Sequence, residues 1–198
     1  IILFSLLILA WLLPNHYLPW LSAYQEFCML LVALFFSFLL VFKNKIYVPK
    51  IAYGIFLIVL IPIIQFILGI IYNFGDALLV SMYIGFFLIT FISGYSVSKL
   101  KDDNKSKILN FFLISFLFSS IISVGLQLNQ WLLLEGNIWI VDLAPNARPF
   151  ANVAQPNLLS TLLITGLFAV FHLYENNKIR SFSASLAIAF ILFGIALT

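Results

Sequence analysis

Charged residues are scarce in this sequence. They make up 9% of its 198 residues, whereas hydrophobic residues make up 64%. An ordinary soluble domain is about 25% charged, because water must solvate its surface. With so few charges, much of this surface has to be solvated by lipid instead. The composition therefore excludes a soluble globular protein and indicates an integral membrane protein.

Cysteine and the common signatures of catalysis are also missing. The single cysteine, Cys28, cannot form a disulfide within the chain or support a metal site built on cysteines. The sequence has no Ser-His-Asp set, no glycine-rich phosphate loop and no metal-ligand spacing. Its net charge is +3, but the basic residues lie between apolar segments. They therefore bear on membrane topology, and no nucleic-acid partner is expected.

What the sequence does have is long apolar segments. Seven stand out, at residues 1–13, 26–42, 51–71, 77–98, 108–128, 157–174 and 182–198. The five inner ones approach or exceed the roughly 17–25 residues that a helix needs to cross a bilayer. They lack the two-residue alternation of membrane β-strands. The predicted fold is all-α, a polytopic transmembrane helix bundle of about seven spans.

The chain is predicted to be a single transmembrane domain over residues 1–198, truncated at both ends. It starts at Ile1 without a methionine, and it stops at Thr198 inside an apolar run. Its first and last segments are short for spans. We therefore expect both to continue beyond the sequence.

The Lys and Arg residues favour one orientation. All ten except Arg148 fall in three connecting loops, at residues 43–50, 99–107 and 175–181. The positive-inside rule makes these loops cytoplasmic, and with them the start of the chain. The outward loops are then residues 14–25, 72–76 and 129–156. The expected protein is multi-pass, with a cytoplasmic N-terminus.

The last of these outward loops contains the best candidate site. Pro156 suits the first turn of a helix, which places Gln155 near its cap. The free N–H groups of that turn and the helix dipole favour an anion there. Asn152 and Asn157 add amides, and the guanidinium of Arg148 suits phosphate oxygens. A lipid-linked phosphate or diphosphate would fit. Alternatively, Arg148 only reaches lipid headgroups and Gln155-Pro156 is an ordinary helix start.

A second outward cluster lies at the start of the chain. His16 could act as an acid or base, and Glu26 heads the second span, where its side chain could face the bundle. Alternatively, this is an interfacial loop with aromatic anchors and a helix-start glutamate.

The segment 148–157, Arg-Pro-Phe-Ala-Asn-Val-Ala-Gln-Pro-Asn, followed by Leu158 to Leu163, resembles the signature of bacterial protein glycosylation ligases. These are the pilin-type O-oligosaccharyltransferases of the O-antigen ligase and polymerase superfamily. His16, Pro19-Trp20 and Glu26 are similar to that family's first outer loop. Many relatives have glycine where this chain has Ala151 and Ala154.

The resemblance implies a function. Such an enzyme moves an oligosaccharide from an undecaprenyl-diphosphate carrier to Ser or Thr of an exported protein such as pilin, on the periplasmic face of the bacterial inner membrane. It implies no metal or other cofactor. It also implies a further outer loop beyond Thr198, so this chain is expected to be catalytically incomplete. Besides this donor and acceptor, the partners are membrane lipids.

Individual roles follow from the two lines of reasoning together. We expect Arg148 and Gln155 to be catalytic, and Asn152, Asn157, His16 and Glu26 to bind substrate. An O-antigen ligase or polysaccharide polymerase would use the same bundle and donor and stays open. A transporter of lipid-linked sugars is less favoured, because no Lys or Arg falls at mid-span.

Overall fold

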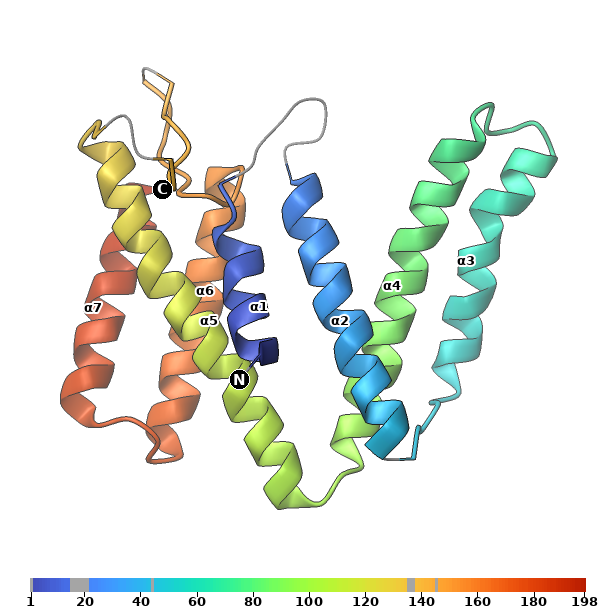
Figure 1. Ribbon diagram of the computed structural model, residues 1–198, viewed down its shortest axis with the longest axis horizontal. Helices are drawn as coiled ribbons and strands as arrows, with labels where there is room; N and C mark the ends of the chain where they lie inside the picture. Colours follow the sequence, from blue (N-terminus) through green and yellow to red (C-terminus); the bar gives the residue numbers. More distant parts are fainter. Residues whose placement is uncertain (1, 15–21, 44, 135–137, 145) are drawn as a thin grey trace. The chain divides into compact units, whose positions relative to one another are not determined.

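The computed structural model describes residues 2–14, 22–43, 45–134, 138–144 and 146–198 (Figure 1). These residues form helices and loops and contain no strand, which confirms the all-α prediction. Seven helices occur in them, one for each predicted apolar segment. They are α1 (Ile2–Leu12), α2 (Ala23–Lys43), α3 (Ile51–Ile67), α4 (Phe74–Ser98), α5 (Asp102–Trp131), α6 (Pro156–Glu175) and α7 (Ser181–Leu197).

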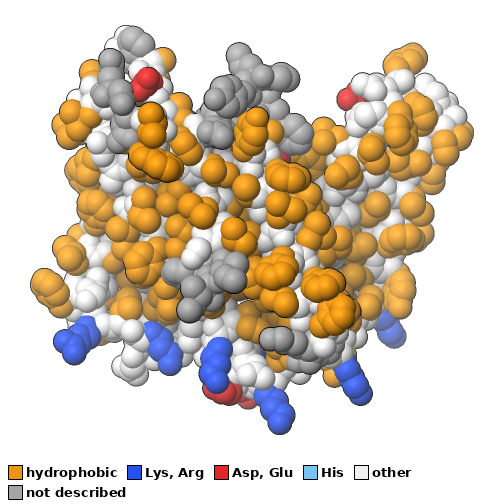
Figure 2. Space-filling view, viewed as in Figure 1, with side chains coloured by type: hydrophobic (Ala, Val, Ile, Leu, Met, Phe, Trp, Pro, Cys, Tyr) orange, Lys and Arg blue, Asp and Glu red, His pale blue; other side chains and the backbone are white. Residues whose placement is uncertain are grey.

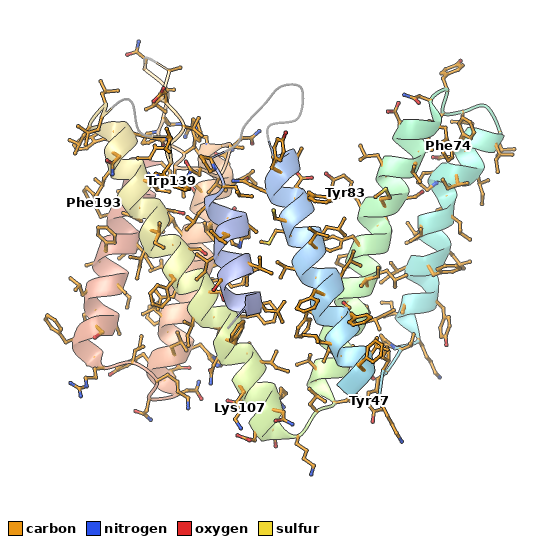
Figure 3. The ribbon with its side chains drawn as sticks, viewed as in Figure 1. Tyr47, Phe74, Tyr83, Lys107, Trp139 and Phe193 are labelled. Atoms are coloured by element: carbon orange, nitrogen blue, oxygen red, sulfur yellow. The ribbon has the colours of Figure 1, made fainter. Side chains whose placement is uncertain are left out.

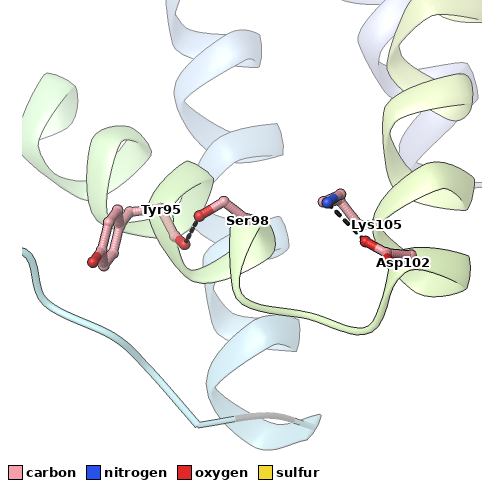
Figure 4. Close-up of polar contacts among 4 residues, drawn as sticks. All are labelled: Tyr95, Ser98, Asp102 and Lys105. Atoms are coloured by element: carbon pink, nitrogen blue, oxygen red, sulfur yellow. Dashed lines mark hydrogen bonds and ion pairs between the residues drawn. The ribbon is translucent and has the colours of Figure 1, made fainter.

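Two helix ends differ from the apolar segments for local reasons. Helix α5 begins earlier than residue 108, since Asp102 and Asp103 occupy its first turn, where the helix dipole favours carboxylates. An ion pair of 2.9 Å between Asp102 and Lys105 supports that turn (Figure 4). Helix α3 ends at Ile67, before residue 71, because Gly69 adopts a positive φ of 73° that stops the helix.

The chain divides into two compact units. The first comprises Ile1–Met29 and Lys107–Thr198, and the second comprises Leu30–Ser106. Helix α2 therefore contributes its start to the first unit and the rest to the second. That both units belong to one transmembrane domain stays a prediction.

The first unit has a core where α5, α6 and α7 meet. Its buried side chains include Val124, Leu163 and Ile191. Gly166 and Gly194 let the helices approach closely. A β-carbon at 166 would lie 2.2 Å from the Ser120 hydroxyl oxygen, and one at 194 would lie 2.5 Å from Val124 Cγ2. Small residues at such crossings are a usual basis of packing between membrane helices.

Buried hydroxyl groups connect the helices of the second unit. The Ser81 hydroxyl on α4 donates to the Val59 carbonyl on α3 at 2.9 Å. The Ser37 hydroxyl on α2 lies 2.7 Å from that of Ser93 on α4. The bonds between helices satisfy polar groups that lipid could not. The exposed Ser98 hydroxyl instead bonds within α4, where it donates to the Tyr95 carbonyl at 2.7 Å (Figure 4).

The helices are suited to a membrane. Four of them, α2, α4, α5 and α6, are long and apolar enough to cross a bilayer by length and composition. Helices α3 and α7 are apolar but have only 17 residues each, and α1 has 11. Figure 2 shows apolar side chains over the flanks of the helices and Lys and Arg side chains at helix ends. The chain is a membrane protein, and about seven spans is slightly more than these lengths show.

Candidate functional site

The candidate site lies on the loop between α5 and α6, in the first unit. Figure 3 shows Trp139 on this loop and Lys107 near the opposite end of α5. The loop packs inward through a few residues only, because Pro149 and Ala151 to Val153 are buried whereas Ala147 and Arg148 are exposed. It therefore has a buried base and an exposed edge, and the predicted site residues are divided between them.

Two tight turns shape the segment before α6, and both are centred on alanines. The Val153 N–H donates to the Phe150 carbonyl at 3.1 Å, with Ala151 at a φ of 52° in the second position of the turn. The Gln155 N–H donates to the Val153 carbonyl at 2.8 Å, around Ala154 at a φ of 64°. A turn of this second kind, with positive φ at its centre, is strained. Left-handed backbone costs an L-residue about 1–2 kcal/mol, which explains why glycine suits both positions.

Helix α6 begins directly after these turns. Gln155 is the cap residue in an extended conformation, with φ −148° and ψ 143°, and Pro156 follows in the first turn. The Gln155 carbonyl accepts the first helical bond, from the Leu159 N–H at 3.1 Å. The Gln155 side chain makes no capping hydrogen bond and is exposed. This is the local structure that Gln155-Pro156 predicts.

Gln130, in the last turn of α5, holds the base of the loop. It is 3% exposed. Its side-chain nitrogen donates to the carbonyls of Val141 and Ala151, both at 2.8 Å. Its side-chain oxygen accepts from the N–H groups of Phe150 at 2.9 Å and Ala151 at 2.7 Å. One side chain therefore satisfies four backbone groups that have no helix or sheet to pair with.

Asn152 connects the loop to the start of the chain. It is 1% exposed, and its side-chain nitrogen donates to the carbonyls of Leu12 and Trp139, both at 2.8 Å. Its side-chain oxygen accepts from the Val141 N–H at 3.4 Å. The Gln25 side chain donates to the Asn152 carbonyl and, at 3.2 Å, to the Leu13 carbonyl. These contacts give the Asn152 side chain an internal role, which differs from the substrate contact expected from the sequence.

The other predicted site residues fall into three groups. Arg148, Gln155 and Asn157 are exposed on or beside the loop, where a ligand could reach them. Glu26 is half-buried in the first turn of α2, where its carboxylate accepts a hydrogen bond from the Ser22 hydroxyl. His16 lies outside the described residues. The structure thus brings Gln25, beside Glu26, against the long loop.

Sequence reasoning missed Gln130. The available signal was a glutamine at the end of an apolar run just before a long polar loop, which resembles any helix-end residue. Nothing in the sequence showed that its amide turns back onto residues 141–151. As for metal ligands, no group of three His, Cys, Asp or Glu side chains comes together within the described ranges.

Two curated proteins, both from Acinetobacter baylyi (strain ATCC 33305 / BD413 / ADP1), are similar to this chain. One is a general O-oligosaccharyltransferase, 36% identical over 196 residues, which are 98% of this chain and 34% of the relative. The chain is homologous to O-oligosaccharyltransferases. The second relative, a ComP-specific O-oligosaccharyltransferase, is 30% identical over 140 residues, which are 70% of this chain and 25% of that relative.

This homology confirms the resemblance read from residues 148–157, and the relatives' names are those of glycosyltransferases. The chain spans about a third of the length of the first relative. No family model matches it, and no solved structure matches it either.

Proposed function

We propose that this chain is the donor-binding part of a bacterial inner-membrane O-oligosaccharyltransferase. The enzyme transfers an oligosaccharide from undecaprenyl diphosphate to Ser or Thr of exported proteins such as pilin. The observation that carries the proposal is the exposed Arg148 on the loop that leads into α6, whose start has no side-chain cap, in a chain homologous to oligosaccharyltransferases. The orientation rests on the Lys and Arg distribution, which makes this loop periplasmic and the N-terminus cytoplasmic.

The reaction explains why this chemistry is needed. The acceptor hydroxyl oxygen bonds to the anomeric carbon of the glycan and loses its proton to the surroundings. The bond between that carbon and the diphosphate oxygen breaks, and the diphosphate leaves with the electron pair. Negative charge therefore grows on the diphosphate, and groups placed to stabilise it lower the barrier.

Each exposed group has a part in this scheme. The guanidinium of Arg148 pairs with diphosphate oxygens in a planar, two-point contact. The first N–H groups of α6 have no helical partners and point toward the same anion. Gln155 and Asn157 orient the carrier or the first sugar with their amides. Glu26 and His16 act on the acceptor side.

The membrane-spanning helices argue against a transporter. In the described helices, charged side chains occur only in the first two turns or the last turn. A transporter of an anionic lipid would need cationic groups deep in its bundle.

The test uses the full-length protein in its cell. The intact mass of the pilin is measured with and without the gene, beside the lipopolysaccharide profile. We expect loss of a glycan-sized mass from pilin, with lipopolysaccharide unchanged. Unchanged pilin together with altered surface polysaccharide would instead establish an O-antigen ligase or polysaccharide polymerase.

A further inference from the structure

The Gln130 side chain has no capacity left for a ligand. A glutamine amide offers two N–H donors and two acceptor lone pairs. All four are used, on Val141, Phe150 and both backbone groups of Ala151. Only 3% of its surface is exposed. Gln130 therefore has no free polar group with which to bind the lipid-linked sugar or the acceptor protein. Any effect on transfer must therefore pass through the loop that it holds.

Two of these hydrogen bonds are to Ala151, whose backbone conformation is unfavourable. Ala151 has a φ of 52°, which a β-carbon disfavours. Gln130 accepts from the Ala151 N–H at 2.7 Å and donates to the Ala151 carbonyl at 2.8 Å. Unfavourable backbone angles of this kind are retained where several surrounding contacts stabilise them. In this conformation both backbone groups of Ala151 are held by the same side-chain amide.

We propose that Gln130 is a positioning residue, whose buried amide fixes the left-handed turn at Ala151 and thereby sets where Arg148 and Gln155 stand. Arg148 comes shortly before this turn and Gln155 shortly after it, so the turn decides the course of both flanks. Asn152, the next residue, fastens the same turn to Leu12 and Trp139. The catalytic consequence rests on the function proposed above.

Gln127 provides a matched control on the same helix. It is also fully buried, but its side chain donates to the Gly194 carbonyl on α7 at 2.9 Å, not to the loop. Gln127→Met and Gln130→Met remove the same amide from one helix and keep a similar volume. Only the second should disturb the loop.

The first experiment reads the loop directly. Spin labels on cysteines at the exposed positions Ala147 and Glu175 report the distance from the loop to the far end of α6, in the full-length protein with its native cysteines replaced by serine. We expect Gln130→Met to broaden this distance distribution and Gln127→Met to leave it sharp. An unchanged distribution in Gln130→Met would overturn the proposal, whatever the activity.

The second experiment measures transfer. We expect Gln130→Met to lower kcat roughly tenfold or more, since small displacements of contact groups are costly, with normal membrane levels. Gln130→Glu keeps the acceptor oxygen but, when ionised, has neither N–H donor and repels the carbonyls of Val141 and Ala151; when protonated, its hydroxyl group restores one donor. Its activity relative to the parent should therefore rise as the pH falls and the carboxyl group is protonated. A flat ratio would contradict the assigned contacts.

The third experiment is a suppressor test. Glycine tolerates positive φ, so Ala151→Gly in the Gln130→Met background should raise the population of the native turn by about tenfold and restore part of the activity. Ala154→Gly removes backbone strain at a residue that Gln130 does not contact, so it should not restore activity. Equal rescue by both, or by neither, would overturn the proposal. If the parent enzyme fails to glycosylate protein while the labels respond as expected, the positioning role stands and the proposed function falls.

Discussion

Arg148 is exposed on the loop before α6, and the proposed diphosphate contact depends on its charge and its planar shape. Arg148→Ala in the full-length protein should lower transfer by roughly tenfold to a hundredfold, because a charge-assisted contact to the leaving group is lost. Arg148→Lys should keep the charge without the two-point geometry and fall in between. Time courses of acceptor mass in membrane preparations measure both.

The control for that series is Arg180→Ala. Arg180, just before α7, is also exposed, and it should tolerate the change. Gln155→Ala belongs to the same series and should reduce transfer without lowering the amount of protein in the membrane. Full activity in both Arg148→Ala and Gln155→Ala would mean that the loop has only a structural role.

Ala154 gives a prediction about stability. Its φ of 64° is unfavourable for alanine, so Ala154→Gly should stabilise the protein by about 0.5–1 kcal/mol. Thermal unfolding in detergent measures the change. Ala189→Gly, at an exposed position inside α7, should instead destabilise by about 1 kcal/mol. A lower midpoint for Ala154→Gly would contradict the strain assigned to this turn.

At the scale of the helices, the contact between α5 and α6 depends on the missing side chain at Gly166. A β-carbon there would lie 2.2 Å from the Ser120 hydroxyl oxygen, which donates to the Leu162 carbonyl at 3.1 Å. Gly166→Ala should therefore cost about 1–3 kcal/mol through overpacking. The same thermal measurement applies.

Two further variants make this test specific. Gly125→Ala changes a glycine of α5 whose β-carbon would meet nothing within 4 Å, and it should be neutral or stabilising. Combining Gly166→Ala with Ser120→Gly exchanges the small residue across the contact and should recover part of the loss. Additive losses in the double variant would argue against direct crowding.

The helices were predictable because each one is an apolar run, and apolar runs are visible without any knowledge of packing. The start of α6 was equally readable from Gln155-Pro156. The contacts of Gln130 and the burial of Asn152 were not predictable. The first depend on how the loop folds back over the end of α5, and the second depends on a contact with Leu12, which is distant in sequence. The positive φ of Ala151 and Ala154 was not visible in the alanines themselves, and only the glycines of relatives at both positions indicated it.

At the scale of the whole molecule, the proposed orientation predicts which loops are accessible from outside. In a full-length protein with its native cysteines replaced by serine, a cysteine in place of Asp142 should react with a membrane-impermeant thiol reagent added to intact cells. A cysteine at Asp103 should react only after the membrane is opened. Both positions are exposed, so accessibility of the side chain itself is matched. The reverse labelling pattern would place the Arg148 loop in the cytoplasm and contradict the proposed function.

The amides that hold this loop have one more consequence. Gln25, Gln130 and Asn152 carry no group that titrates between about pH 3 and pH 11, and their contacts are to backbone atoms. An outward surface meets whatever acidity and salt the surroundings impose. The frame of this loop should keep its shape through such changes, whereas the Arg148 contact should weaken as ionic strength rises. Changes in pH and ionic strength would then affect ligand binding and leave the loop conformation unchanged.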